Sequence, residues 1–169
     1  MDNNTVLRSL RYALNYNDAQ MAELLALGGY RSEKGGEESL MKSLLTREDE
    51  PGFMTCSDEA LIRFLDGLIV HRRGPSESAR KASSPSSLSN NLILKKLRIA
   101  FELREDDMID TFTRGGFEIS GTELSALFRR PGHKNYRHCG DQLLRKFLKG
   151  LAESGRAQTS AGSNFDRRQ

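Results

Sequence analysis

The chain has 169 residues, of which 37% are hydrophobic and 29% are charged, a composition typical of a globular protein with one ordinary core or two small ones. No apolar run approaches the ~20 residues that a membrane-spanning helix needs. The first residues also lack the basic flank and apolar stretch of a secretion signal. We therefore expect a cytoplasmic protein that does not enter a membrane.

The net charge of +3 conceals two oppositely charged halves. Residues 1–74 contain 9 Lys and Arg against 12 Asp and Glu, a balance of −3, whereas residues 90–153 contain 12 against 9, a balance of +3. The remaining segments supply further positive charge, so the pI near 9.0 does not by itself indicate a nucleic-acid-binding protein.

The two halves are copies of one another. Residues 3–30 align with residues 90–117 without a gap, and nine of these 28 positions are identical. After a four-residue slip, residues 44–68 align with residues 127–151. This second block pairs Arg47 with Arg130, Cys56 with Cys139 and Asp58 with Asp141. Such self-similarity predicts two copies of one structural unit of roughly 70 residues.

Unit one, residues 1–73, has the pattern of four helices. The first helix carries one apolar stripe, and Asn3 or Asn4 is expected to cap it. The second helix is predicted at about 18–27, with Gly28-Gly29 as its stop. The third and fourth helices are predicted at about 37–45 and 58–70. The apolar stripe of the first helix consists of Val6, Leu7, Leu10, Ala13 and Leu14.

A Ser- and Pro-rich linker, residues 74–89, leads to unit two, residues 90–153. The linker has no apolar period, so we expect it to be flexible, like the tail at 154–169. Unit two repeats the helical pattern, with a first helix capped by Ser89 or Asn90. Its second and fourth helices are predicted at about 105–113 and 141–152. Its third helix is predicted to start at Ser120, where Glu123 completes a capping box.

No segment alternates with the period of two that a strand requires. The predicted fold class is all-α, with two homologous four-helix units packed as a pseudo-twofold pair. We expect the units to meet through the apolar faces of their first and fourth helices. Cys56 and Cys139 are too isolated for a CxxC knuckle and are expected to be buried, reduced thiols.

Three runs of the sequence resemble a known family. They are NNLILKKLRIAFEL, RRPGHKNYRHCGDQLLRKFLKGL and REDEPGFMTCSDEALIRFLDGLI. The chain is similar in these runs to the YehS-like family, a bacterial cytoplasmic domain of unknown function that occurs as a tandem duplication. The resemblance covers residues 3–152 and implies the tandem architecture, but it brings no reaction, ligand or catalytic residue.

The loop before each fourth helix has an Arg, an aromatic residue, a Cys and an Asp at the same places in both units. The charged residues between them differ. The aromatic residues and cysteines at these places are interpreted as structural, because aromatic side chains and free Cys are usually buried. They are Phe53, Tyr136, Cys56 and Cys139. The variable charges are candidate ligands, and the acidic loop, Glu48-Asp49-Glu50, is predicted to face the loop of His133 and Lys134 or another basic patch on unit two. The candidate binding residues are Arg47, Glu48 and Asp49 in unit one, and Arg130, His133, Lys134, Asn135, Arg137 and Asp141 in unit two.

Catalysis and metal binding receive little support. His133, His138, Cys139 and Asp141 carry metal-binding groups, but their spacing does not match a structural zinc site and unit one lacks the histidines. Cys139 beside His138 in sequence does not make a nucleophile pair. No phosphate loop, dinucleotide fingerprint or hydrolase elbow occurs. We predict no catalytic residue, no metal and no cofactor.

These observations favour a non-enzymatic cytoplasmic binding or regulatory protein, with an unknown protein partner and homo-oligomerisation left open. The alternative is a nucleic-acid-binding protein that uses a basic face of unit two. An enzyme with His133 and Asp141 at its site is the third hypothesis. The basic residues of the alternative are Arg129, Arg130, Lys134, Arg137, Arg145, Lys146 and Lys149.

Overall fold

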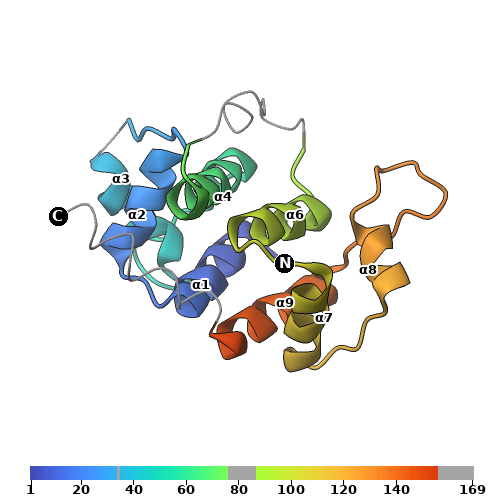
Figure 1. The fold of residues 1–169 in the computed structure, drawn as a ribbon. Coiled ribbons are helices and arrows are strands. Elements are labelled where there is room, and N and C mark those ends of the chain that lie inside the picture. The colour runs from blue at the N-terminus through green and yellow to red at the C-terminus, as the bar shows by residue number, and fades with distance from the viewer. Residues whose placement is uncertain (34, 76–86, 156–169) are drawn as a thin grey trace.

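A computed structural model describes residues 1–33, 35–75 and 87–155 (Figure 1). Most of the predicted linker and nearly all of the predicted tail lie outside these residues. Within them every regular element is a helix. Unit one contains α1 (Asn3–Leu14), α2 (Asp18–Leu27), α3 (Gly36–Leu45) and α4 (Asp58–Arg73). Unit two contains α6 (Asn90–Ala100), α7 (Glu105–Arg114), α8 (Gly121–Leu127) and α9 (Asp141–Ser154).

The helices begin close to the predicted residues, with one difference in capping. Asp2, and not Asn3 or Asn4, caps α1, because its side chain accepts the Thr5 amide at 2.8 Å. Ser89 caps α6, one of the two predicted alternatives, and the capping box of Ser120 and Glu123 is confirmed. The fourth helices run past their predicted ends, to Arg73 in unit one and Ser154 in unit two.

Asn4 is buried and connects α1 to the loop before α4. Its side-chain amide donates to the carbonyl oxygens of Leu44 at 2.9 Å and Met54 at 2.8 Å, and its oxygen accepts the Cys56 amide at 2.9 Å. Asn91 makes the same three contacts in unit two, to Leu127, Arg137 and Cys139. These asparagines therefore bind distant backbone groups that would otherwise lack partners in the interior.

Glycine allows the fourth helix of each unit to touch the second one. A Cβ atom on Gly67 of α4 would lie 1.7 Å from the carbonyl oxygen of Leu24 in α2. A Cβ atom on Gly150 of α9 would lie equally close to the carbonyl oxygen of Thr111 in α7. Both units therefore depend on the same close backbone approach, which no larger residue permits.

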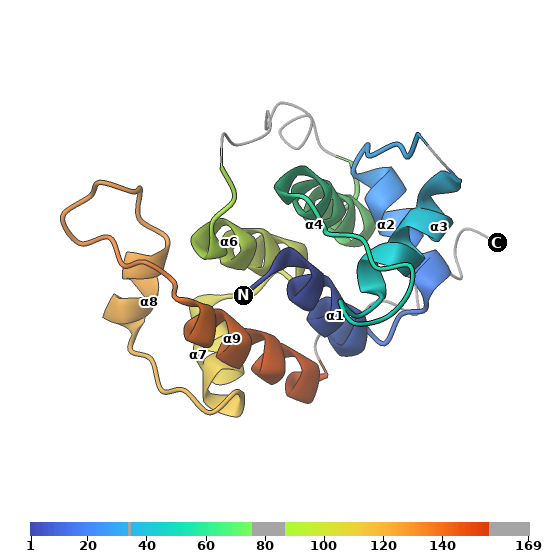
Figure 2. The same ribbon diagram turned by 180° about the vertical axis from the view of Figure 1, so that it is seen from behind.

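The two units pack through their first and fourth helices, as predicted. In Figures 1 and 2, α4 lies beside α6 and α1 lies beside α9, and both pairs are in contact. Since α1 corresponds to α6 and α4 to α9, a pseudo-twofold axis relates the two contacts. We name them the α4–α6 seam and the α1–α9 seam. Buried side chains of both units join into one core between them.

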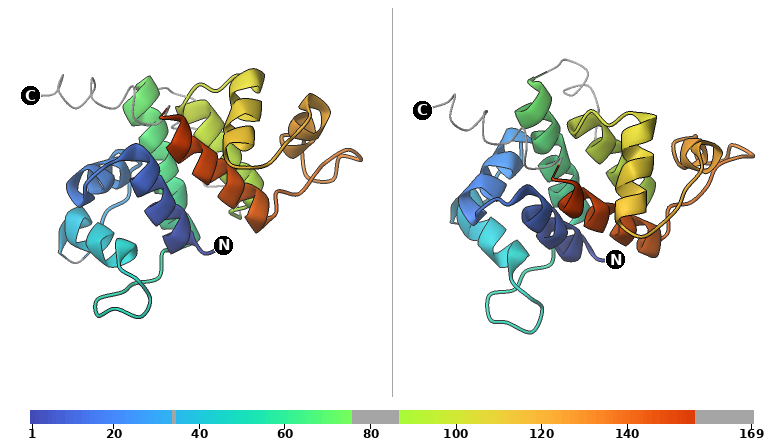
Figure 3. Two further views of the ribbon diagram at one scale, coloured as in Figure 1. Left: turned by 90° about the horizontal axis from the view of Figure 1, so that it is seen from below. Right: turned by 60° about the horizontal axis from the view of Figure 1, so that its bottom comes forward.

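The two loops before the fourth helices do not meet. In both views of Figure 3, the loop of residues 46–57 and the loop of residues 128–140 project from opposite parts of the molecule. The first alternative, that the acidic loop faces the loop of His133 and Lys134, is therefore wrong. The physical reason is that the pseudo-twofold axis passes between the paired helices, whereas the loops extend away from it.

Candidate anion-binding groove between the units

The α4–α6 seam is closed by charged side chains. Lys96 forms an ion pair with Asp66, and these side chains are only 11% and 18% exposed. Near the end of α6, the Arg72 guanidinium lies 4.3 Å from the centre of the Phe101 ring, and its Nε donates to the Ala100 carbonyl oxygen at 3.2 Å. These contacts join the two units at two places along the seam.

The α1–α9 seam lacks the equivalent contacts. The repeat places Ser9 where the other seam has Lys96, and Lys149 where it has Asp66, so no ion pair can form between them. The counterpart of Arg72 is Gly155, which has no side chain to cover the end of α1. The two seams therefore share a backbone arrangement and differ in how it is filled.

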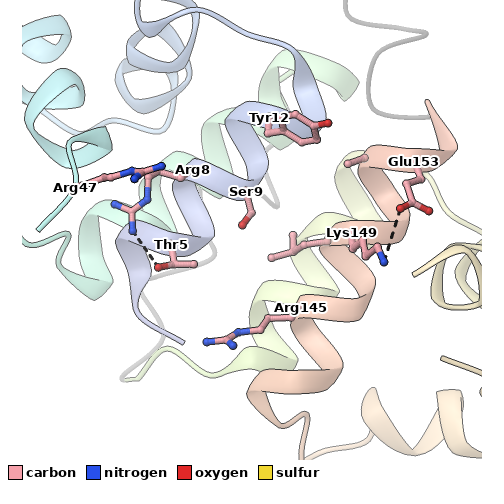
Figure 4. Close-up of a pocket in the computed structure, with 10 residues that line it drawn as sticks. Thr5, Arg8, Ser9, Tyr12, Arg47, Arg145, Lys149 and Glu153 are labelled. Atoms are coloured by element: carbon pink, nitrogen blue, oxygen red, sulfur yellow. Dashed lines mark hydrogen bonds and ion pairs between the residues drawn. The ribbon is translucent and has the colours of Figure 1, made fainter. Parts of the chain in front are cut away.

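A groove of about 630 Å³ occupies the α1–α9 seam (Figure 4). Unit one contributes Thr5, Arg8, Ser9 and Tyr12 from α1 and Arg47 from the loop after α3. Unit two contributes Arg145, Leu148, Lys149, Ala152 and Glu153 from α9. An adjoining hollow of about 420 Å³ shares Tyr12 and Ala152 and continues along α1 to Tyr16. The site is therefore built by both units.

Positive charge dominates the groove, with four cations against the single carboxylate of Glu153. The Arg8 guanidinium donates to two neutral oxygens, the Thr46 carbonyl at 3.2 Å and the Thr5 hydroxyl at 3.1 Å. Because Thr46 precedes Arg47, these contacts bring two guanidinium groups to one wall. Lys149 lies 4.0 Å from Glu153, and both side chains are more than half exposed. Four cations and one carboxylate leave the groove lining a net charge of +3.

Two further carboxylates lie near the groove and are already hydrogen-bonded. Burial acts to raise the pKa of Asp2, but hydrogen bonds from Thr5 and the charge of Arg8 lower it overall. The pKa of Asp141 is lowered mainly by the N-terminal amine of Met1, which it binds, and by the Asn90 amide at 2.8 Å. Within the described part of the chain, no carboxylate lies within ion-pair distance of Arg8, Arg47 or Arg145.

Tyr12 stands out on the groove because it is a large aromatic residue that is 78% exposed. It points away from the buried stripe of α1, and its counterpart in the closed seam is Ile99, which is only partly exposed. The apolar side chains of Leu148 and Ala152 lie on the opposite wall, on α9. The groove therefore combines cationic groups with an exposed aromatic ring and an apolar patch.

The sequence-predicted residues are distributed over several places. Arg47 lines the groove, whereas Glu48 and Asp49 are exposed on the loop beyond it. His133 accepts the Asn135 amide on its Nδ1 at 3.0 Å, and these residues lie with Arg130 and Lys134 on the exposed loop of unit two. Arg137 lies 3.5 Å from Glu123. Asp141 begins α9, as expected of a first-turn acid.

The basic residues of unit two do not form a single face. Arg145 and Lys149 line the groove, but the Lys146 side chain lies beside Gly116, behind α9. Arg129, Arg130 and Lys134 belong to the projecting loop. Charge that is clustered in the sequence is thus divided between the groove and two other places.

The cysteines are buried, free thiols in both units. Burial, assisted by the charge of Asp58, raises the pKa of Cys56 to about 12. Burial also raises the pKa of Cys139 to about 11, an effect that the charge of Arg137 opposes and that of Asp141 assists. Thiols with such pKa values carry little thiolate at neutral pH, the form that acts as a nucleophile. Across residues 1–33, 35–75 and 87–155, no three His, Cys, Asp or Glu side chains gather as metal ligands would.

Sequence reasoning missed Arg8, Ser9 and Tyr12. A usable signal was present for Tyr12, because an aromatic residue that lies off the apolar stripe of an amphipathic helix is expected to be exposed. No local pattern indicates that Arg8 and Arg145 lie on one groove, because they belong to different units. That juxtaposition follows only from the pairing of α1 with α9.

Comparison with known proteins identifies the family. The family described as "Protein of unknown function (DUF1456)" matches residues 3–74 and again residues 90–156. The chain is 45% identical over 152 residues to "Uncharacterized protein YehS" of Escherichia coli (strain K12), covering 90% of this chain and 95% of that protein. No solved structure matches. No helix in the described ranges is long and apolar enough to cross a membrane. The chain belongs to the DUF1456 family and contains two copies of its domain.

Proposed function

We propose that this protein is a non-enzymatic binding protein of the cytoplasm that takes an anionic partner into the groove between α1 and α9. The observation that carries the proposal is the contrast between the seams. Along one seam the largely buried Lys96–Asp66 ion pair joins the helices. The pseudo-symmetric counterpart has an ion pair at its end, between the Met1 amine and Asp141, but along α1 and α9 it is a groove lined by cations. The two buried free thiols fit a reducing compartment.

The charge balance of the groove supports an anion. Arg8, Arg47 and Arg145 contribute three guanidinium groups that form no ion pair at contact distance among the described residues, although the charge of Arg8 is felt by Asp2 and that of Arg145 by Asp141. Lys149, paired with Glu153, lies beside them. Walls of low dielectric on both sides of a cleft concentrate such a field and attract ligands of opposite charge. An arginine fork also matches the geometry of phosphate and carboxylate oxygens.

Other functions have less support. The 128–140 loop carries exposed cations and projects from the molecule, and none of its residues lines the groove or the adjoining hollow. An enzyme that uses Cys56 or Cys139 would need a thiolate, which burial disfavours in both. His133 and Asp141 are held by different partners, Asn135 for the former and Asn90 for the latter.

The test uses inorganic tripolyphosphate as the probe, followed by amide NMR shifts at low ionic strength. Binding in the groove should move amides of α1 and α9, and the double variant Arg145→Ala/Lys149→Ala should bind about tenfold more weakly. The matched control is Lys95→Ala, because Lys95 is the exposed counterpart of Arg8 in the repeat but lies on α6. This variant should bind like the wild type.

Two results would contradict the proposal. One is a set of shifts centred on residues 128–140, which would move the binding surface to the basic loop. The other is unchanged affinity in the double variant with a normal unfolding curve.

A further inference from the structure

We infer that the anionic partner is single-stranded nucleic acid, an inference that rests on the groove proposed above as the binding site. The first argument is the shape of the site. The groove and its adjoining hollow follow α1 from Thr5 to its end at Leu14, a distance of about 14 Å at 1.5 Å per residue, and reach Tyr16 just beyond it. A groove of this length accommodates a few nucleotides of one strand.

A duplex fits the site less well. Proteins that read duplex DNA usually insert a projecting helix or ribbon into a groove of the nucleic acid. Here the two helices instead form the walls of a groove, and cationic side chains from both helices line it. A single strand can enter such a groove, whereas a rigid duplex touches only its rim.

Tyr12 supplies the second argument, because it distinguishes nucleic acid from other polyanions. Proteins that bind single strands combine cations along the backbone path with aromatic side chains on which bases stack. Tyr12 is the exposed aromatic of the groove, and its neighbours there include Arg8 on one helix and Lys149 on the other. An acidic peptide or inorganic polyphosphate would use the cations and leave the ring unused.

The experiment is fluorescence anisotropy at low salt with labelled 12-nucleotide single strands, oligo-dT and oligo-U, and with a 12-base-pair duplex. We expect the single strands to bind at least about tenfold more tightly than the duplex. The logarithm of affinity should fall with the logarithm of salt concentration at a slope of about −3, because four cations neutralise phosphates at about 0.7 each.

The variants test each part of the site. Tyr12→Ala should weaken binding about tenfold, while Tyr12→Phe should retain it, because stacking needs the ring and not the hydroxyl. Arg47→Ala should reduce the salt slope by about 0.7. The matched control is Arg130→Ala, because Arg130 occupies the same place in the other unit but does not line the groove. It should leave both affinity and slope unchanged.

The outcomes separate this inference from the proposed function. If the duplex binds as tightly as the single strands, or if Tyr12→Ala binds normally, the occupant is not a stacked single strand. If a poly-glutamate peptide binds and Arg145→Ala/Lys149→Ala abolishes it while both oligonucleotides fail, the groove remains an anion site and the inference is wrong. If no oligonucleotide, peptide or tripolyphosphate binds, the proposed function fails with it.

Discussion

The α4–α6 seam and the α1–α9 seam are two solutions of one packing problem. Equivalent helices form them, yet the first holds Lys96 against Asp66 and the second holds Ser9 opposite Lys149. A duplicated domain that pairs with itself makes each inter-unit contact twice. One contact suffices to hold the units together when the core continues between them, so the other is free to diverge. The comparison indicates which surface can bind a ligand and which holds the fold.

The variants with the largest expected loss of stability test whether the two units differ only at the seams or also in their interiors. Asn4→Ala removes the partners of two carbonyl groups and one amide, and Asn91→Ala does the same in unit two. Two of the three hydrogen bonds in each unit are buried and one is part-buried. Each buried group left unpaired costs about 1–3 kcal/mol and the part-buried one less, so each variant should lose about 3–5 kcal/mol of unfolding free energy. Urea denaturation measures this loss.

The comparison of the two asparagine variants carries the test. Similar losses of stability would mean that the asparagine contacts contribute equally in the two units, which then differ only where they meet. A loss in Asn91→Ala of less than about 1 kcal/mol, beside a large loss in Asn4→Ala, would show that the units themselves have diverged.

The next prediction concerns a substitution that removes the ion pair of the α4–α6 seam. Asp66→Ala leaves the Lys96 ammonium largely buried without its partner, and should cost about 2–4 kcal/mol. Its counterpart in the open seam, Lys149→Ala, should change stability by no more than about 0.5 kcal/mol, because that side chain is 62% exposed. Urea titrations of both variants at the same pH compare the seams directly.

A control separates the loss of the ion pair from a general packing defect. The double variant Asp66→Leu/Lys96→Met replaces both charges by apolar side chains and should recover most of the lost stability. Failure to recover would mean that Asp66 acts through something other than Lys96.

A smaller effect concerns the end of the closed seam. Arg72→Ala removes the contact with the Phe101 ring and the hydrogen bond to the Ala100 carbonyl oxygen, and should cost about 1–2 kcal/mol. Hydrogen exchange should increase at the C-terminal end of α6. The control is Arg73→Ala, which loses only an exposed pair with Glu102 at 3.5 Å and should cost less than about 1 kcal/mol. Equal losses would remove the special role of Arg72.

Much of the fold could be predicted from the sequence because it is encoded locally. Apolar stripes at helical spacing placed the helices, and the internal alignment identified both units and the pairing of first with fourth helices. The exact role of Asn4 could not be predicted, because its acceptors lie 40 and 50 residues away at Leu44 and Met54. An asparagine at the start of a helix has the same local pattern whether it caps that helix or binds a distant loop.

The candidate site was harder to predict for a related reason. A groove between units is defined by residues at the margins of the apolar stripes, and the sequence does not indicate which margins meet. The difference between the charged loops of the two repeats predicts a binding site on them. Among their residues, only Arg47 lines the groove. Lys149 is one of several basic residues in the sequence of unit two. Its position in an open groove depends on the small Ser9 side chain on the opposite helix.

The smallest expected effect on stability comes from making the seams alike. Ser9→Lys with Lys149→Asp recreates in the α1–α9 seam the residue types of Lys96 and Asp66. The backbone arrangement is already shared, so the new pair should form, with a coupling of about 0.5–1 kcal/mol in a double-mutant cycle measured by urea denaturation. Tripolyphosphate binding should fall, because the pair occupies the groove. Lys149→Ala is the matched control, since it leaves the groove with the same net charge as the double variant while keeping it open. Weaker binding in the double variant than in Lys149→Ala would therefore report closure and not charge, whereas a coupling of zero would mean that the seams differ in geometry as well as in the residues that fill them.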